Sequence, residues 1–147
     1  MSMIENHSDT TLSTDILRCI PEAVIYADLN GIIQGWNPGA ETVFGFPATE
    51  ALGQSLDLII PERMRKAHWD GYNKAIARSG TLPGRTSMIT RSLHKSGDQI
   101  YVDMSFAMVH DAQGQLLGSL AVARDATARF TEEKNLRRQL AELTPKP

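Results

Sequence analysis

The chain has 147 residues, of which 41% are hydrophobic, and a formal net charge of −2. This size accommodates one hydrophobic core with terminal extensions and excludes a second folded domain. Its Lys and Arg residues are dispersed and not in excess, so a nucleic-acid-binding surface is not expected. Without a signal peptide or an apolar run near the roughly 20 residues of a membrane span, the sequence predicts a cytoplasmic protein with no membrane contact.

The N-terminal part of the chain predicts a short helix followed by a β-hairpin. Residues 1–13 are polar and are expected to form a flexible segment, after which Ser13 or Thr14 caps a helix that ends before Pro21. The Asn30-Gly31 pair predicts a tight turn between two strands, because both residue types tolerate positive φ. The predicted strands are 23–27 and 32–36.

The rest of the chain alternates predicted short helices with three longer strands. Asn37, before Pro38, is expected to cap the first of these helices, and Pro at helix starts, Gly at helix ends and the Gly-containing turns place the boundaries. The predicted helices are 38–43, 47–53 and 61–78, and the predicted strands are 86–94, 100–109 and 116–124. In residues 130–147, Leu136, Leu140 and Leu143 form the seam of an exposed helix for signalling or coiled-coil pairing.

Four segments of the chain carry recognisable motifs: Gly31 to Phe46, Glu50 to Gly53, Lys95 to Asp98 and Asp125 to Arg129. Taken together, they resemble the PAS family of sensor domains. Their order and spacing match that family from Ile16 to Arg129. The resemblance implies an α+β fold, in which a five-stranded antiparallel sheet carries short helices on one face and a C-terminal linker helix follows. It also implies a PAS sensor domain over residues 14–129.

The PAS fold leaves a cavity between sheet and helices, which the family fills with core side chains, a metabolite, flavin or haem. Flavin photosensors of the family use a reactive cysteine on a cavity helix. The only cysteine here, Cys19, precedes the first strand, so that photochemistry is excluded. A single cysteine also fits a reducing compartment. Flavin bound without a cysteine adduct stays an alternative, as does a cavity without any cofactor.

The segment from Pro61 to Tyr72 resembles the helix from which haem-binding PAS sensors of the FixL and Dos type ligate iron. By that resemblance His68 is the proximal ligand of haem b. Trp69, which stands between His68 and Asp70, departs from the pattern. The same comparison implies further cofactor contacts, namely Trp69, Tyr72, Met88, Met104, Phe106 and Leu120.

Met88 falls where FixL-like sensors carry the arginine that hydrogen-bonds bound oxygen. A thioether donates no hydrogen bond, but it is a soft ligand that raises the reduction potential of haem iron. Met88 or Met104 is therefore a candidate distal ligand, and the choice between them stays open. The predicted signal is a diatomic gas (O2, CO or NO) or the redox state, with oxygen disfavoured by Met88.

Haem also needs basic groups for its propionates, and the sequence supplies candidates on both sides of the cavity. They are Arg65, Lys66, Arg85 and Arg91. At the end of the domain, Asp125 and Arg129 resemble the family's junction, in which a carboxylate and a basic group tie the last strand to the outgoing helix.

Interpretations that need no haem compete with the haem site. A lone helical histidine is often a hydrogen-bonded core or surface residue, and methionine readily fills irregular apolar space. No catalytic signature is present, so the chain is not expected to be an enzyme. The alternatives to a haem sensor are a PAS interaction module that dimerises and a sensor of a small metabolite. In each case we expect a homodimer whose output lies in a separate partner or an attached domain.

Overall fold

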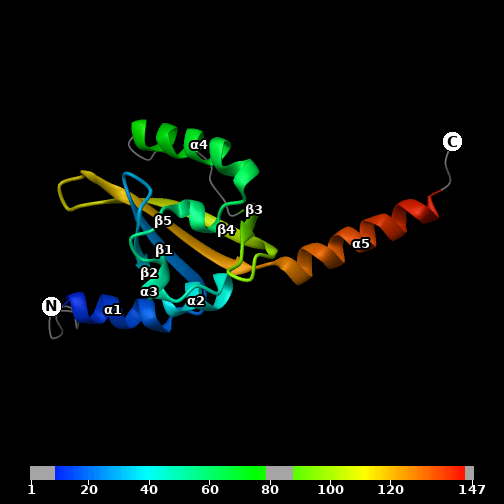
Figure 1. The fold of residues 1–147 in the computed structure, drawn as a ribbon, viewed down its shortest axis with the longest axis horizontal. Helices are drawn as coiled ribbons and strands as arrows, with labels where there is room; N and C mark the ends of the chain where they lie inside the picture. The colour runs from blue at the N-terminus through cyan, green and yellow to red at the C-terminus, as the bar shows by residue number, and fades with distance from the viewer. Residues whose placement is uncertain (1–8, 79–87, 145–147) are drawn as a thin grey trace.

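A five-stranded antiparallel sheet forms the centre of the protein (Figure 1). The computed structural model describes residues 9–78 and 88–144. The strand order is β2-β1-β5-β4-β3, so the first hairpin and the last three strands meet where β1 pairs with β5. This is the predicted α+β architecture. The strands are β1 (Ala23–Asp28), β2 (Ile33–Trp36), β3 (Met88–Leu93), β4 (Gln99–His110) and β5 (Leu116–Asp125).

Short helices and one longer helix cover one face of this sheet, and a further helix extends away from it. Figure 1 shows α4 across from the sheet and α5 projecting beyond the sheet's end. On the covered face lie α2 (Pro38–Phe44), α3 (Ala48–Ala51), the 3-10 turns η2 (Leu56–Ile59) and η3 (Glu62–Met64), and α4 (Arg65–Ala77). The others are α1 (Asp9–Cys19) and α5 (Thr127–Leu143).

Local sequence explains the first hairpin and the start of α2. Gly31 has φ +76°, and the Asp28 carboxylate accepts hydrogen bonds from the backbone N–H groups of Asn30 and Ile32. The Asn37 side chain accepts from the N–H of Ala40 and so caps α2. Both features confirm the predicted turn and cap.

Two helices begin earlier than predicted. Helix α1 begins at Asp9, and Thr14 lies inside it, where its hydroxyl donates to the carbonyl of Thr10 instead of capping the helix. Helix α5 begins at Thr127, because the Asp125 carboxylate accepts from the Thr127 N–H. The predicted boundary between residues 129 and 130 therefore falls within α5.

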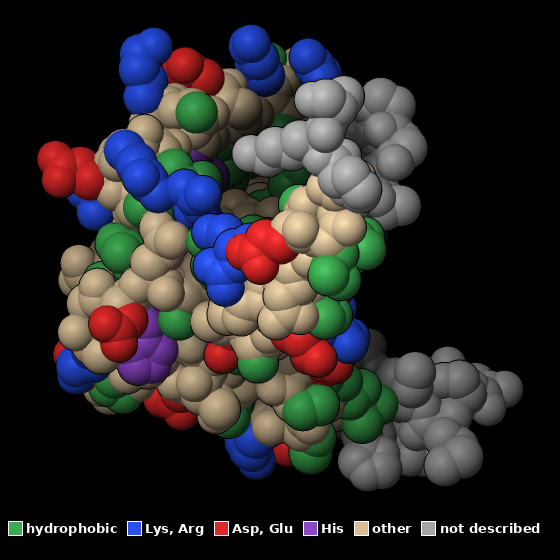
Figure 2. Space-filling view, turned by 90° about the vertical axis from the view of Figure 1, so that its right-hand side faces the viewer, with side chains coloured by type: hydrophobic (Ala, Val, Ile, Leu, Met, Phe, Trp, Pro, Cys, Tyr) green, Lys and Arg blue, Asp and Glu red, His purple; other side chains and the backbone are tan. Residues whose placement is uncertain are grey.

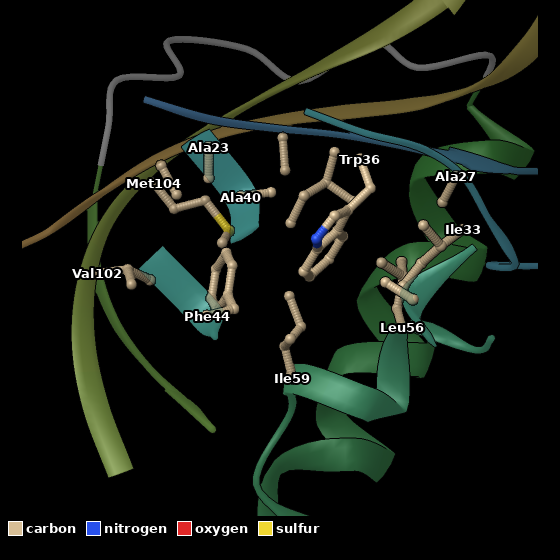
Figure 3. Close-up of a cluster of buried hydrophobic side chains, with 14 of the residues drawn as sticks. Ala23, Ala27, Ile33, Trp36, Ala40, Phe44, Leu56, Ile59, Val102 and Met104 are labelled. Atoms are coloured by element: carbon tan, nitrogen blue, oxygen red, sulfur yellow. The ribbon is translucent and has the colours of Figure 1, made fainter. Parts of the chain in front are cut away.

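The core lies where α2 packs onto the sheet (Figure 3). Phe44 is fully buried, and its ring lies 5.6 Å from that of Trp36. Trp36 donates its indole N–H to the carbonyl of Phe46. Figure 3 shows the sulfur of Met104 directed toward Phe44. This end of the domain is filled by its own side chains, which fixes the sheet beneath the neighbouring cavity.

Candidate functional site

A large apolar cavity lies between α4 and the sheet, with a volume of about 730 Å³. That volume is within the usual range for sites that bind cofactors and small molecules. Figure 2 shows a hollow in the surface with Lys and Arg side chains beside it. The four methionines of the described residues all line the cavity: Met64, Met88, Met104 and Met108.

His68 lines this cavity from α4. Its Nδ1 atom is buried and has no hydrogen-bond partner among the described residues. Burial lowers the pKa of the imidazole, and the charge of Asp57 opposes this effect only partly. A buried polar atom without a partner costs roughly 1–3 kcal/mol. His68 is thus held in its neutral form at an energetic cost, a state suited to a ligand for iron.

Two neighbouring aromatic residues fix α4 over one end of the cavity. Trp69 donates its indole N–H to the Asp57 carboxylate at 2.7 Å, and its ring lies against Gly31 in the β1–β2 turn. Tyr72 lines the cavity, and its hydroxyl donates to the carbonyl of Asp28 at 2.6 Å. Trp69 is not among the residues that line the cavity. Its role in the structure is to position α4, so a direct cofactor contact by Trp69 is not supported.

The two candidate distal methionines lie opposite each other on β3 and β4. Met88 and Met104 are register partners, and both line the cavity. They differ in burial, since Met88 is 53% exposed and Met104 only 5% exposed. Met104 belongs to the packed core beside Phe44. Met88 is therefore the methionine with freedom to contact a ligand.

Of the two remaining predicted contacts, the structure brings one to the cavity. Phe106 lines it from β4 and is 39% exposed. Leu120 instead lies in a second, smaller pocket beside α1, on the other face of the sheet. Ser119 and Ala121 line the cavity, and because side chains alternate along a strand, Leu120 between them must face away. The prediction for Leu120 is wrong for this reason.

The basic residues predicted to contact the haem propionates make other contacts in the structure. Arg65 donates to the carbonyls of Ile60 and Asp57, and Lys66 pairs with Asp70 in solvent. The guanidinium of Arg91 lies 6.0 Å from the ring of Tyr101, its register partner, on the outer face of the sheet. Arg65 and Lys66 lie outside the cavity lining, whereas Arg91 is a lining residue whose guanidinium lies near Tyr101. Arg85 lies outside the described residues.

Sequence reasoning missed Arg63, Met64 and Met108, all of which line the cavity. Met108 continues the two-residue spacing of Met104 and Phe106 along β4, so strand alternation was a usable signal for it. Arg63 lies in the 3-10 turn before α4, where no helical or strand period indicates the direction of a side chain. Its position follows only from how that turn is packed.

The junction to α5 lies on the outer face of β4. The ring of Tyr101 stacks on that of Phe130 at 4.0 Å, and the Tyr101 carbonyl accepts from the Thr127 hydroxyl. Arg129 pairs with Asp103 at 3.5 Å. The basic residue of the junction therefore ties α5 to β4, not to the last strand as the sequence suggested. Asp125 retains a local role at the start of the helix.

Within residues 9–78 and 88–144, no group of three or more His, Cys, Asp or Glu side chains is arranged to hold a metal ion. No helix in those segments is both long and apolar enough to span a membrane.

The PAS fold family matches residues 10–126 of the chain. Curated relatives include the sensor protein FixL of Bradyrhizobium diazoefficiens, 44% identical over 57 residues, which are 39% of this chain and 11% of FixL. The oxygen sensor protein DosP of Escherichia coli is 28% identical over 111 residues, 74% of this chain and 13% of DosP. The chain thus spans only a small part of these relatives.

Solved structures share the fold at lower identity. A PAS domain from Colwellia psychrerythraea superposes with a TM-score of 0.70 at 22% identity, covering 82% of this chain and 99% of that one. An RNA-binding light-oxygen-voltage receptor superposes with a TM-score of 0.74 at 20% identity, covering 91% of this chain and 37% of that one. These likenesses establish the architecture around the cavity.

Proposed function

The chain belongs to the PAS family, and from that premise we propose that it is a sensor domain that binds haem b through His68. The observation that carries this proposal is the buried Nδ1 of His68, which has no hydrogen-bond partner among the described residues and lies beside an apolar cavity of about 730 Å³. Similarity to FixL and DosP supports it. Haem in this cavity would supply an iron centre that binds O2, CO or NO or changes its oxidation state.

The residues around the cavity have distinct parts in this proposal. Burial keeps His68 neutral, with a lone pair available to a metal. Ile25, Ala27 and Ala121 give the sheet side of the cavity an apolar surface that excludes water. Met88, exposed and without a place in the packed core, would be the preferred second ligand of the haem iron. A thioether there favours CO, NO or redox state over oxygen as the signal.

We propose that β4 carries the signal from the cavity to α5. Along this strand Val102 and Met104 are buried in the core cluster, while Tyr101 contacts Phe130 on the other face. Because side chains alternate along a strand, Met104 faces the cavity while Tyr101 faces α5. A displacement of Met104 would therefore move the backbone that also holds Tyr101. The output would lie beyond α5 or in a partner. In a homodimer, α5 of each copy would transmit the signal.

An absorption titration with haem tests the haem proposal. We expect a Soret band in the wild-type protein that is lost or shifted in His68→Ala. His94→Ala is the matched control, because His94 is engaged with Ser96 at the start of the β3–β4 turn and does not line the cavity. This variant should bind haem like the wild type.

Absence of a Soret band from the wild type would refute haem binding. The alternatives would then separate by thermal stability, because a metabolite that binds only the folded state raises the melting temperature. A cavity that no small molecule stabilises would favour the PAS interaction module. A Soret band unchanged in His68→Ala would refute the assigned ligand alone.

A further inference from the structure

Arg63 connects the two sides of the cavity mouth. It lies in η3, directly before α4, lines the cavity and is exposed to solvent. Its Nη2 donates to the side-chain oxygen of Gln99, at the start of β4, at 3.3 Å. The guanidinium is therefore placed at the opening between the helix side and the sheet side.

The partner of Arg63 is neutral, which distinguishes it from nearby basic residues. Arg65 and Lys66 each lie within ion-pair distance of an aspartate, Asp57 and Asp70 respectively. Among the described residues, no carboxylate lies within ion-pair distance of Arg63. A guanidinium has several N–H donors and binds carboxylates in a bidentate manner. With respect to the described residues, most of the donors of Arg63 thus remain available to an acid group at the cavity mouth.

We propose that Arg63 is a specificity-determining residue that recognises the carboxylates of the cavity's ligand. The site would select a large apolar body that ends in an acid group, with the apolar part against the methionines and the acid group at the mouth. This inference rests on the proposed function, since the propionates of haem would be those carboxylates. Arg65 and Lys66 lie outside the cavity lining, and the guanidinium of Arg91, which also lines the cavity, lies 6.0 Å from the ring of Tyr101.

A comparison of haem with its dimethyl ester isolates this contact, because esterification removes the negative charges and leaves the ring intact. Arg63→Gln removes the guanidinium at an exposed position. Lys66→Gln removes the same charge from the next turn, where Lys66 faces solvent and lies outside the cavity lining. Both ligands would be titrated into each variant by absorption in the same detergent solution, after circular dichroism has confirmed that the variants are folded.

We expect Arg63→Gln to bind haem about fivefold more weakly, the upper range for an exposed ion pair. Its affinity for the ester should change less than about twofold. The ratio of the two affinities should be unchanged in Lys66→Gln and partly restored in Arg63→Lys. Because only the change in that ratio between variants is interpreted, the different solubilities of the two ligands cancel.

The outcomes separate this inference from the proposed function. If Arg63→Gln leaves the ratio at its wild-type value while haem still binds, the role of Arg63 is refuted and the haem site stands. If Lys66→Gln changes the ratio as much as Arg63→Gln, the preference for haem over its ester comes from the general surface charge and not from a specific contact. The inference then also fails. If the wild type binds neither ligand, the haem site itself is refuted, and this role of Arg63 falls with it.

Discussion

The two ends of the covered sheet face are built differently. At one end α2 packs onto the sheet through Phe44, which is fully buried, and through Ala40, which is also fully buried. At the other end α4 lies over a cavity of about 730 Å³ and is positioned by Trp69 and Tyr72. Figure 1 shows the same contrast, with α2 close to the sheet and α4 standing off from it.

This contrast separates the residues that stabilise the fold from those that await a ligand. The packed end buries apolar side chains against one another, which is the main favourable term in folding. The open end keeps a buried histidine nitrogen that has no partner in the part of the chain that the structure describes, and a methionine that is 53% exposed. Neither feature stabilises the free protein, so both are better explained by binding.

The largest expected effect on the free energy of unfolding comes from a substitution at the packed end. Phe44→Ala should lower the free energy of unfolding by about 3–5 kcal/mol, because it opens a void in a core with little freedom to collapse. Met88→Ala, at the open end, should change it by less than about 0.5 kcal/mol, as at other exposed positions. Urea denaturation of both variants measures the difference. Equal losses would contradict the division of the sheet face into two ends.

A pair of glycine substitutions tests the anchor of α4. Gly31 and Gly53 both have positive φ, +76° and +84°, so alanine strains both backbones. A Cβ at Gly31 would overlap the Trp69 ring, whereas one at Gly53 meets nothing within 4 Å. Gly31→Ala should therefore cost about 1–2 kcal/mol more than Gly53→Ala. Equal unfolding free energies for the two variants would show that Trp69 does not anchor α4 to the turn.

The hydroxyl of Tyr72 is the second anchor. Tyr72→Phe removes its hydrogen bond to the Asp28 carbonyl and should cost about 1 kcal/mol. Tyr26→Phe is the control, because the Tyr26 hydroxyl donates to the Leu117 carbonyl at a longer 3.1 Å on the exposed side. We expect a smaller loss there. A loss from Tyr26→Phe as large as that from Tyr72→Phe would mean that the Tyr72 hydrogen bond stabilises the protein no more than an exposed one.

The smallest effect has the opposite sign. His68→Leu should leave the free protein as stable as the wild type or more stable by about 1 kcal/mol, since it removes a buried nitrogen that is unpaired within residues 9–78 and 88–144. Burial lowers the pKa of His68 in the folded state, so the unfolded chain binds the proton more readily. Wild-type stability should therefore fall as the pH drops below about 6.5, and this component should be missing from His68→Leu. A destabilised His68→Leu variant would indicate a structural histidine.

Sequence patterns were reliable where the chemistry is local. The turn at Asn30-Gly31 and the cap at Asn37 depend on near neighbours and were predicted correctly. Leu120 was placed on the wrong face, because strand alternation gives relative faces while the pairing register decides which one meets the cavity. The start of α5 was missed although Asp125, two residues before Thr127, was a usable local signal; the second contact of Thr127, with Tyr101, is distant in sequence. Arg63 was missed for a similar reason, since its partner Gln99 is on another element.

Hydrogen exchange of the free and haem-treated protein, read by mass spectrometry, tests the central claim most directly. The account predicts that amides of α4 (Arg65–Ala77) exchange faster than those of α2 (Pro38–Phe44) in the free protein. Haem should then slow exchange in α4 while leaving α2 unchanged. Equal protection of the two helices without ligand, or no change in α4 on addition of haem, would contradict a domain whose open end is completed by its ligand.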